Sequence, residues 1–125
     1  MLKNNQLMAF VGTVDKDKAK KFYRDTLGLK LVKDQSPFAL VFDCAGIMLR
    51  VSIVPKLTPA GFTVLGWHTD NVVAEVKKLA KRGVVFERYP GMEQDEHGVW
   101  QSPDGAKIAW FKDPDGNVLS LAQLE

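Results

Sequence analysis

The stretch DKDKAKKFYRDTLGL, residues 15–29, decides how the first half of the chain folds. Its apolar side chains recur at the three- and four-residue spacing that places them on one face of a helix. They are Ala19, Phe22, Tyr23 and Leu27. Asp15 can cap the helix N-terminus, and Gly28 follows the last apolar position, where a C-terminal glycine is common. We therefore expect a helix with one buried face.

Short apolar runs on both sides of this helix predict strands. They span residues 7–13 before the helix and residues 29–33, 38–43 and 48–54 after it. Ala45-Gly46 supplies a turn between the last two runs. The first half of the chain is therefore predicted to be strand–helix–strand–strand–strand.

The same order of elements starts again after the Pro- and Gly-rich linker PKLTPAG, residues 55–61. A second helix is expected between Asn71 and Gly83. The expected strands span residues 62–68, 84–88, 99–101, 107–112 and 118–123. An additional hairpin-like insertion lies around residues 89–99. We expect a single α+β domain over residues 1–125, with two βαβββ modules (about 1–55 and 62–125) that form a curved, partly open barrel of mixed β-sheet around a shared space.

Composition narrows the classes of function. The 125 residues are 46% hydrophobic and 26% charged, and the net charge of +2 comes from interleaved acidic and basic residues. A nucleic-acid partner is not expected, because such proteins cluster their basic side chains. No apolar run is long enough to span a bilayer, no signal peptide is indicated, and the lone Cys44 cannot form an internal disulfide. We expect a cytoplasmic protein.

Three motifs in order resemble those of the vicinal-oxygen-chelate superfamily, which includes glyoxalases, bleomycin-resistance proteins and dioxygenases. They are Asp15 with AKKFYRDTLGL, HTDN before the second helix, and the closing WFKDPDGNVLSL at residues 110–121. The resemblance covers essentially the whole chain. It implies the glyoxalase/bleomycin-resistance fold.

The resemblance also implies where metal-dependent members would place four ligands. The matching positions are Met8, Arg50, Val64 and Ser120. Divalent metals in such sites take imidazole or carboxylate donors, which these four side chains do not provide. We therefore expect no metal and no other cofactor.

Alternation of side chains along strands extends these four positions into a predicted cavity wall. We assign to the ligand-binding cavity the residues Met8, Phe10, Met48, Arg50, Ser52, Val64, His68, Trp100, Trp110 and Ser120. Trp67 should point away from this wall.

Three residues leave alternatives open. Arg50 could hold a carboxylate or phosphate of a ligand, or it could pair with an internal carboxylate or lie at a solvated rim. His68 is a weak candidate for a catalytic acid–base group, and a lone histidine is more often structural. His97 is either an ordinary loop residue or part of a lid formed by residues 89–99.

The leading hypothesis is a metal-free protein that binds a small anionic or aromatic molecule, similar to the bleomycin-resistance branch. That resemblance implies a homodimer. The alternative is a glyoxalase-like lyase or isomerase, or a dioxygenase-related enzyme, with ligands at shifted positions or with His68 acting beside Arg50. An interaction module without any ligand is a third possibility.

Overall fold

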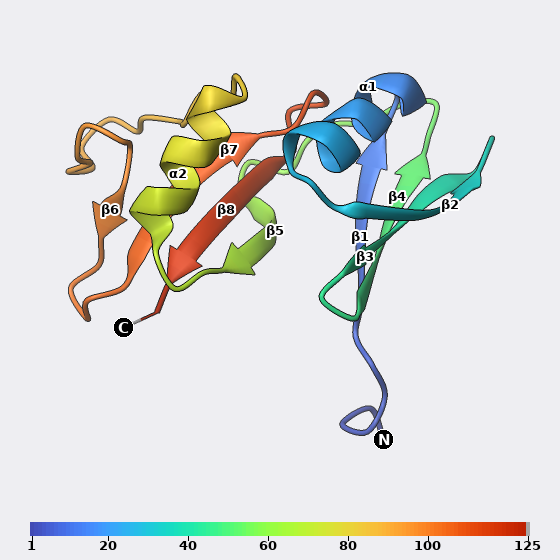
Figure 1. Ribbon diagram of the computed structural model, residues 1–125, viewed down its shortest axis with the longest axis horizontal. Helices are drawn as coiled ribbons and strands as arrows, with labels where there is room; N and C mark the ends of the chain where they lie inside the picture. The colour runs from blue at the N-terminus through green and yellow to red at the C-terminus, as the bar shows by residue number, and fades with distance from the viewer. Residues whose placement is uncertain (125) are drawn as a thin grey trace. The chain divides into compact units, whose positions relative to one another are not determined.

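The computed structural model describes residues 1–124, which form two compact units. Unit 1 ends at Pro59 and unit 2 begins at Ala60. Each unit contains one four-stranded mixed sheet and one helical segment (Figure 1). The predicted α+β class and the repeated βαβββ order are confirmed.

Unit 1 follows the predicted order of elements. Its elements are β1 (Met8–Thr13), α1 (Lys16–Lys20), η1 (Lys21–Thr26), β2 (Lys30–Gln35), β3 (Ala39–Cys44) and β4 (Ile47–Ile53). The strand order in the sheet is β1-β4-β3-β2. β1 runs parallel to β4, whereas the β2–β3 and β3–β4 pairs are antiparallel. Ala45 and Gly46, with φ of 49° and 88°, make the tight turn that joins β3 to β4.

The first helix begins at its predicted cap but is not α-helical throughout. Asp15 accepts a hydrogen bond from the Lys18 backbone N–H at 3.1 Å. From Lys21 onward the helix widens to a π-helix, in which the Leu27 N–H donates to the Phe22 carbonyl, five residues earlier, at 2.9 Å. The expectation of one uniform helix was therefore incomplete, because periodicity cannot resolve one added residue per turn.

The core of unit 1 lies between this helix and one face of the sheet. Tyr23 is fully buried and its ring lies 5.9 Å from that of Phe42. Along β1 the burial alternates: Val11 is buried, whereas Phe10 is 57% exposed. The buried helix residues Ala19 and Tyr23 thus cover one face of the sheet. The other face, which carries Phe10, is not covered by the helix.

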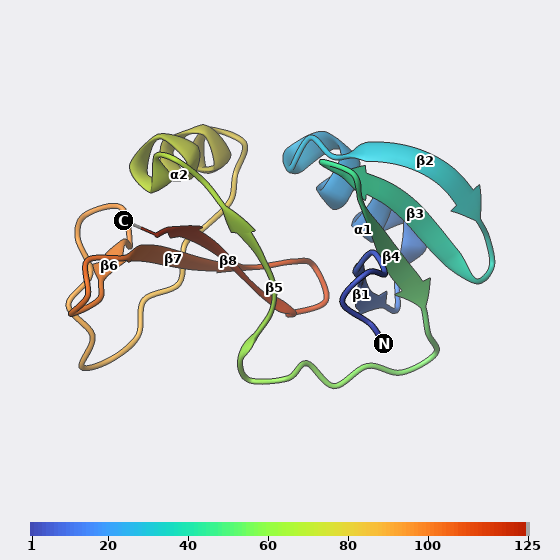
Figure 2. The same cartoon turned by 90° about the horizontal axis from the view of Figure 1, so that it is seen from below.

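Unit 2 repeats this plan with a better-formed helix. Its elements are β5 (Thr63–His68), α2 (Val72–Lys81), β6 (Trp100–Gln101), β7 (Lys107–Lys112) and β8 (Val118–Gln123). The strand order β5-β8-β7-β6 corresponds to that of unit 1. Asn71 caps α2 by accepting a hydrogen bond from the Ala74 N–H at 3.1 Å. Figure 2 shows α2 lying along one face of this sheet.

The strand predicted at residues 84–88 is absent, and that prediction was wrong. Glu87 donates one backbone hydrogen bond to the Trp110 carbonyl, at 2.8 Å, beside β7. The two-residue strand β6 pairs with the other end of β7. The edge position beside β7 is therefore shared between two short segments, because the chain leaves it at residue 89 and returns only at residue 100.

The inserted segment 89–99 is held by the side chain of Gln94. Its Nε2 donates to the carbonyls of Glu87, at 2.9 Å, and Gly98, at 2.8 Å, and its Oε1 accepts from the Tyr89 N–H at 2.8 Å. Asp95 adds two bonds by accepting from the N–H groups of residues 97 and 99. The amide of one half-buried side chain thus supplies the hydrogen bonds that backbone pairing would supply in a regular hairpin.

The closing turn DPDGN forms as predicted. The Asp113 carboxylate accepts hydrogen bonds from the backbone N–H groups of Asp115 and Asn117, at 3.0 and 2.9 Å. The Asn117 side chain donates to the same carboxylate at 2.8 Å. Asp113 and Asn117 are both buried, so this polar pair fixes the approach of β7 to β8.

No helix within residues 1–124 is long and apolar enough to cross a membrane.

Gly98 and Gly91 give a matched test of how the insertion packs. Both have positive φ, 84° and 78°, but a Cβ at Gly98 would lie 3.2 Å from the Phe86 Cβ, whereas a Cβ at Gly91 would meet nothing within 4 Å. Gly91→Ala should lower the free energy of unfolding by about 1 kcal/mol through φ strain alone. Gly98→Ala should lower it by about 2–3 kcal/mol, since steric overlap adds to the strain. Urea unfolding of both variants checks this, and equal losses would contradict the proposed packing of Gly98 on Phe86.

Candidate ligand-binding site

The sheet face of unit 2 that carries Ser120 bears most of the predicted cavity residues of this unit. Cross-strand pairing forms two rows on it, Gly66–Ser120–Trp110 and His68–Ala122–Ile108–Trp100. Directly paired residues point to the same side of a sheet. The structure therefore places His68, Ser120, Trp110 and Trp100 on one face, as the sequence analysis expected. Whether they contact a ligand stays a prediction.

Val64 does not follow this pattern. The register of β5 against β8 shifts between Thr63 and Leu65, so Val64 has no direct partner. Thr63 pairs with Val118 instead, and its side chain approaches a Cβ position built on Gly66 to 4.0 Å. Thr63 thus approaches the face of Gly66 at the β-bulge. Exposure along β5 still alternates, with Val64, Gly66 and His68 exposed, so a ligand contact of Val64 stays a prediction.

Gly66 leaves room for the hydroxyl of Ser120. A Cβ at Gly66 would lie 2.8 Å from the Ser120 Oγ. The Ser120 hydroxyl therefore lies directly above Gly66. It is a polar group on a sheet face whose other side chains are mostly apolar. A hydroxyl in this place can accept or donate one hydrogen bond to a ligand.

Aromatic rings make up the other end of this face. The ring centroids of Trp100 and Trp110 lie 6.1 Å apart, and Tyr89 meets Trp110 edge to face at 5.6 Å. Such spacings are typical of favourable aromatic pairs. Sequence reasoning proposed the two tryptophans but missed Tyr89, whose place at the start of the insertion gave no periodic signal.

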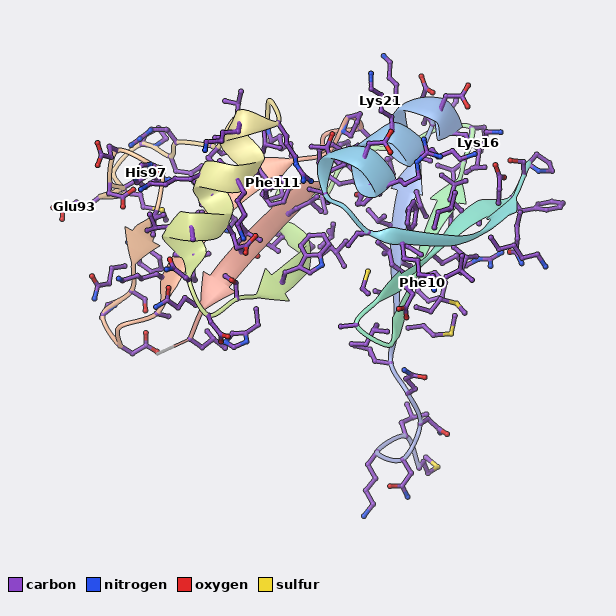
Figure 3. All side chains as sticks on the ribbon, in the orientation of Figure 1. Phe10, Lys16, Lys21, Glu93, His97 and Phe111 are labelled. Atoms are coloured by element: carbon purple, nitrogen blue, oxygen red, sulfur yellow. The ribbon has the colours of Figure 1, made fainter. Side chains whose placement is uncertain are left out.

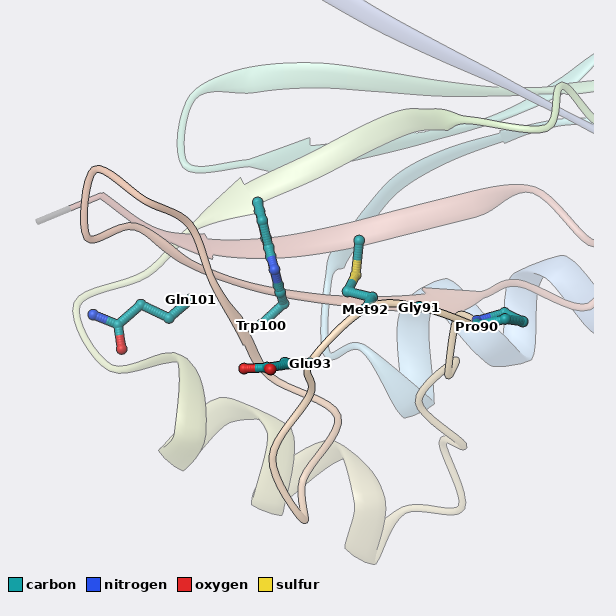
Figure 4. Close-up of a pocket in the computed structure, with 6 residues that line it drawn as sticks. All are labelled: Pro90, Gly91, Met92, Glu93, Trp100 and Gln101. Atoms are coloured by element: carbon teal, nitrogen blue, oxygen red, sulfur yellow. The ribbon is translucent and has the colours of Figure 1, made fainter.

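A pocket of about 600 Å³ adjoins this aromatic cluster. Its lining comes from the insertion and from β6: Pro90, Gly91, Met92, Glu93, Trp100 and Gln101. Figure 4 shows the Trp100 ring and the Met92 side chain extending in the same direction from their two segments. A flat ring and a flexible thioether suit an aromatic group, and Glu93 and Gln101 add polar atoms to the same lining. The volume lies within the roughly 300–1,000 Å³ of typical small-molecule sites.

Two other residues lie away from this pocket. Trp67 stacks at 6.5 Å on the buried Phe111, so it belongs to the core on the opposite face of the sheet. His97 lines a different groove, beside helix α2. The proposed role of His97 in a lid therefore has no support from the pocket beside Trp100.

In unit 1 the predicted cavity residues also share a face. Met8 pairs with Met48, Phe10 with Arg50, and Gly12 with Ser52. Met8, Phe10 and Met48 are 45, 57 and 40% exposed, whereas Val11 and Val51 on the opposite face are buried. The same rows continue across β3 and β2 to Asp43, Lys30 and Lys33, so this unit presents a mixed surface of apolar and charged side chains that includes Arg50.

Arg50 has a neutral partner in the structure. Its Nη1 donates to the Gln35 Oε1 at 2.8 Å, and it forms no ion pair with any residue of the described range 1–124. The alternative of an internal carboxylate partner is therefore not supported. The guanidinium carries more hydrogen-bond donors than one amide oxygen can satisfy, so it can still grip an anionic group.

The donor chemistry does not fit a divalent metal ion. Relatives that use one would place ligands at the positions of Met8, Arg50, Val64 and Ser120, and none of these supplies an imidazole or a carboxylate. Among residues 1–124, no group of three or more His, Cys, Asp and Glu side chains is placed to hold a metal. No step of a reaction is therefore assigned to a metal in this protein.

The side chains around His68 and Cys44 do not favour a catalytic role for either residue. His68 is exposed and its side chain has no hydrogen bond or ion pair in the described part of the chain. Burial, with a smaller contribution from Asp43, raises the pKa of the Cys44 thiol, which makes its reactive thiolate scarcer at neutral pH.

Comparison with known proteins agrees with this geometry. A structure from Sphaerobacter thermophilus, a member of the glyoxalase/bleomycin resistance protein/dioxygenase superfamily, has a TM-score of 0.75 at 24% identity, with 99% of this chain and 100% of that chain covered. Lactoylglutathione lyase from Agrobacterium tumefaciens has a TM-score of 0.74 at 19% identity, with 95% and 93% covered.

TnmS3, an antibiotic binding protein from Streptomyces sp. CB03234, is 28% identical, with a TM-score of 0.72 and coverage of 100% and 99%. No curated protein matches the sequence. The family model for the Glyoxalase/Bleomycin resistance protein/Dioxygenase superfamily matches residues 5–121. The chain therefore belongs to the glyoxalase/bleomycin resistance protein/dioxygenase superfamily.

Proposed function

We propose that this protein binds a small molecule without a metal ion and holds an aromatic part of it against Trp100. The observation that carries the proposal is the pocket of about 600 Å³ beside the Trp100–Trp110–Tyr89 cluster. Ring faces, a methionine and a few polar groups recognise a flat ligand by stacking and shape. TnmS3, the similar structure at 28% identity, is an antibiotic binding protein, which is consistent with this reading.

Within unit 1, Arg50 is proposed separately as a contact for a negatively charged group. Phe10, its partner on β1, is exposed, and its hydrogen-bond partner Gln35 is neutral. A guanidinium presents a planar fork of donors to a carboxylate, sulfonate or phosphate.

No observation favours the alternative of a lyase, isomerase or dioxygenase-related enzyme. The His68 side chain has no described partner that would orient it, and acid–base catalysis depends on a positioned side chain. The likeness to lactoylglutathione lyase, at 19% identity, concerns the fold, and one fold supports many chemistries.

The proposed place of action is the cytoplasm, since the single cysteine offers no internal disulfide.

The three tryptophans allow a direct test of the aromatic site. Naphthalene-1-sulfonate, a flat aromatic anion, should shift the indole N–H signals of Trp100 and Trp110 in an NMR titration and leave that of Trp67 nearly unmoved. Trp100→Ala should weaken binding about tenfold, because it removes a ring contact worth about 1 kcal/mol and the area it covers. Cyclohexanesulfonate, a non-aromatic anion with a smaller ring, should bind more weakly.

A neutral ligand and a variant of Trp67 serve as controls in the same titration. Neutral 2-naphthol should also shift the Trp100 and Trp110 signals, because stacking on the ring faces does not need a charge. Trp67→Phe, on the opposite face of the unit 2 sheet, should leave the affinities for both naphthalenes unchanged. A titration in which neither Trp100 nor Trp110 responds would overturn the proposed site.

Metal content gives an independent test. Protein incubated with Zn²⁺, Ni²⁺, Mn²⁺ or Fe²⁺ and then passed through a desalting column should carry far less than one ion per chain, because the expected positions lack suitable donors. Elemental analysis measures this. One tightly held ion per chain would sink the metal-free assignment.

We also propose that the protein is a homodimer. Val32 in β2, the outer strand of the unit 1 sheet, and Phe38 in the turn after it are 58 and 71% exposed, and contact with a second copy would remove them from water. Sedimentation velocity should then give a species of twice the 13.9 kDa chain mass. Phe38→Asp should shift it to monomer, and a monomeric wild-type protein at high concentration would refute the proposal.

A further inference from the structure

A second hollow lies in unit 2, between helix α2 and the segments that follow it. Its volume is about 460 Å³. The helix contributes Val76, Lys77, Ala80 and Lys81, which recur at helical spacing along one face. Val84, Phe86 and Arg88 come from the extended segment after the helix, and residues 96–98 close the hollow. We call this hollow the helix groove.

The floor of the helix groove is apolar and firmly packed. Val76 is 2% exposed, and the Phe86 ring lies 5.4 Å from that of the buried Phe111. At the end of the groove Gly98 lies so close to Phe86 that even a Cβ would meet it at 3.2 Å. These contacts belong to the protein core, so the groove is preformed and does not depend on a mobile surface loop.

The rim of the helix groove is basic. Lys77 and Lys81 form no ion pair with any residue from 1 to 124, and Arg88 donates only to the Gln94 carbonyl, at 3.4 Å. The one carboxylate in the lining, that of Glu96, is 86% exposed and lies 3.6 Å from the Nε2 of His97. Figure 3 labels His97 on the inserted segment. Three cations thus border an apolar floor, and the single acidic group points toward water.

We propose that the helix groove binds an amphipathic monocarboxylate: its hydrocarbon part lies on Val76, Val84 and Phe86, and its carboxylate is held by Lys77, Lys81 and Arg88. An apolar floor takes hydrocarbon out of water, and unpaired cations at the rim favour an anion over a neutral molecule of the same length. This site does not involve Trp100, and the proposal stands or falls separately from the proposed function.

A hollow of this volume suits a small ligand better than a folded partner, since it lies within the roughly 300–1,000 Å³ of small-molecule sites. Decanoate is a suitable probe because it joins a flexible hydrocarbon chain to one carboxylate. Decanol has the same chain without the charge, and butyrate has the charge with little hydrocarbon.

The test is an NMR titration of the full-length protein with these three probes. Decanoate should shift the backbone amide signals of Val76, Ala80 and Phe86, and decanol and butyrate should bind more weakly. The double variant K77Q/K81Q should weaken decanoate binding roughly five- to tenfold, since each exposed ion pair contributes modestly, and it should not affect decanol. Raising the salt concentration should weaken decanoate binding in the same way.

Lys78→Gln is the matched control. Lys78 lies on the same helix, is 70% exposed, pairs with Glu75 at 3.3 Å and does not line the groove. This variant should bind decanoate as the wild type does. Equal losses in K78Q and K77Q/K81Q would mean that only net charge matters and would overturn the site.

Two further outcomes would also overturn the proposal. In one, decanoate shifts the Trp100 and Trp110 indole signals instead of the groove amides, which would assign it to the aromatic site. In the other, an acidic amphipathic peptide binds the groove tightly while decanoate at millimolar concentration does not, which would make the groove a protein-docking surface. Failure of naphthalene-1-sulfonate to bind would leave the groove result unaffected.

Discussion

Each sheet of this protein can bury only one face under its helical segment, and that constraint organises everything else. In unit 1 the helix covers the side of Val11 and Val51 and leaves the side of Phe10 and Arg50 exposed. In unit 2 the core takes Trp67 and Phe111 and leaves Ser120 and the paired tryptophans on the other face. Strand alternation thus decides which residues stabilise the fold and which remain available for a ligand.

The same alternation explains how much the sequence could predict. Regular patterns were sufficient where structure is regular: the repeat, the caps at Asp15 and Asn71, and the rows on the two sheets. Prediction failed where one residue is added or a strand is interrupted, as in the π-helix after Lys21 and the absent strand at residues 84–88. Such features depend on contacts between distant segments, which a local pattern does not record.

The inserted segment 89–99 shows this limit most clearly. Its sequence suggested a loop over a cavity, yet Gln94 fixes it with three hydrogen bonds to backbone groups of the same unit. Because the segment is anchored, it can shape two hollows: the pocket beside Trp100 and one end of the helix groove. Neither hollow was predictable, since each is lined by residues that only tertiary packing brings together.

Membership of the superfamily does not by itself identify the function of this protein. The residue types at the ligand positions that the resemblance implies are more informative. A metal-dependent enzyme gains its reactivity from the ion. The resemblance implies ligand positions that here carry a thioether, a guanidinium, an isopropyl group and a hydroxyl, which are not donors of the kind such an ion takes. These faces carry groups suited to recognition: ring surfaces, charged side chains that include Arg50, and the hydroxyls of Ser52 and Ser120. The two sheets do not depend on these positions, because the faces that hold the core together are not the faces that carry Met8, Arg50 and Ser120.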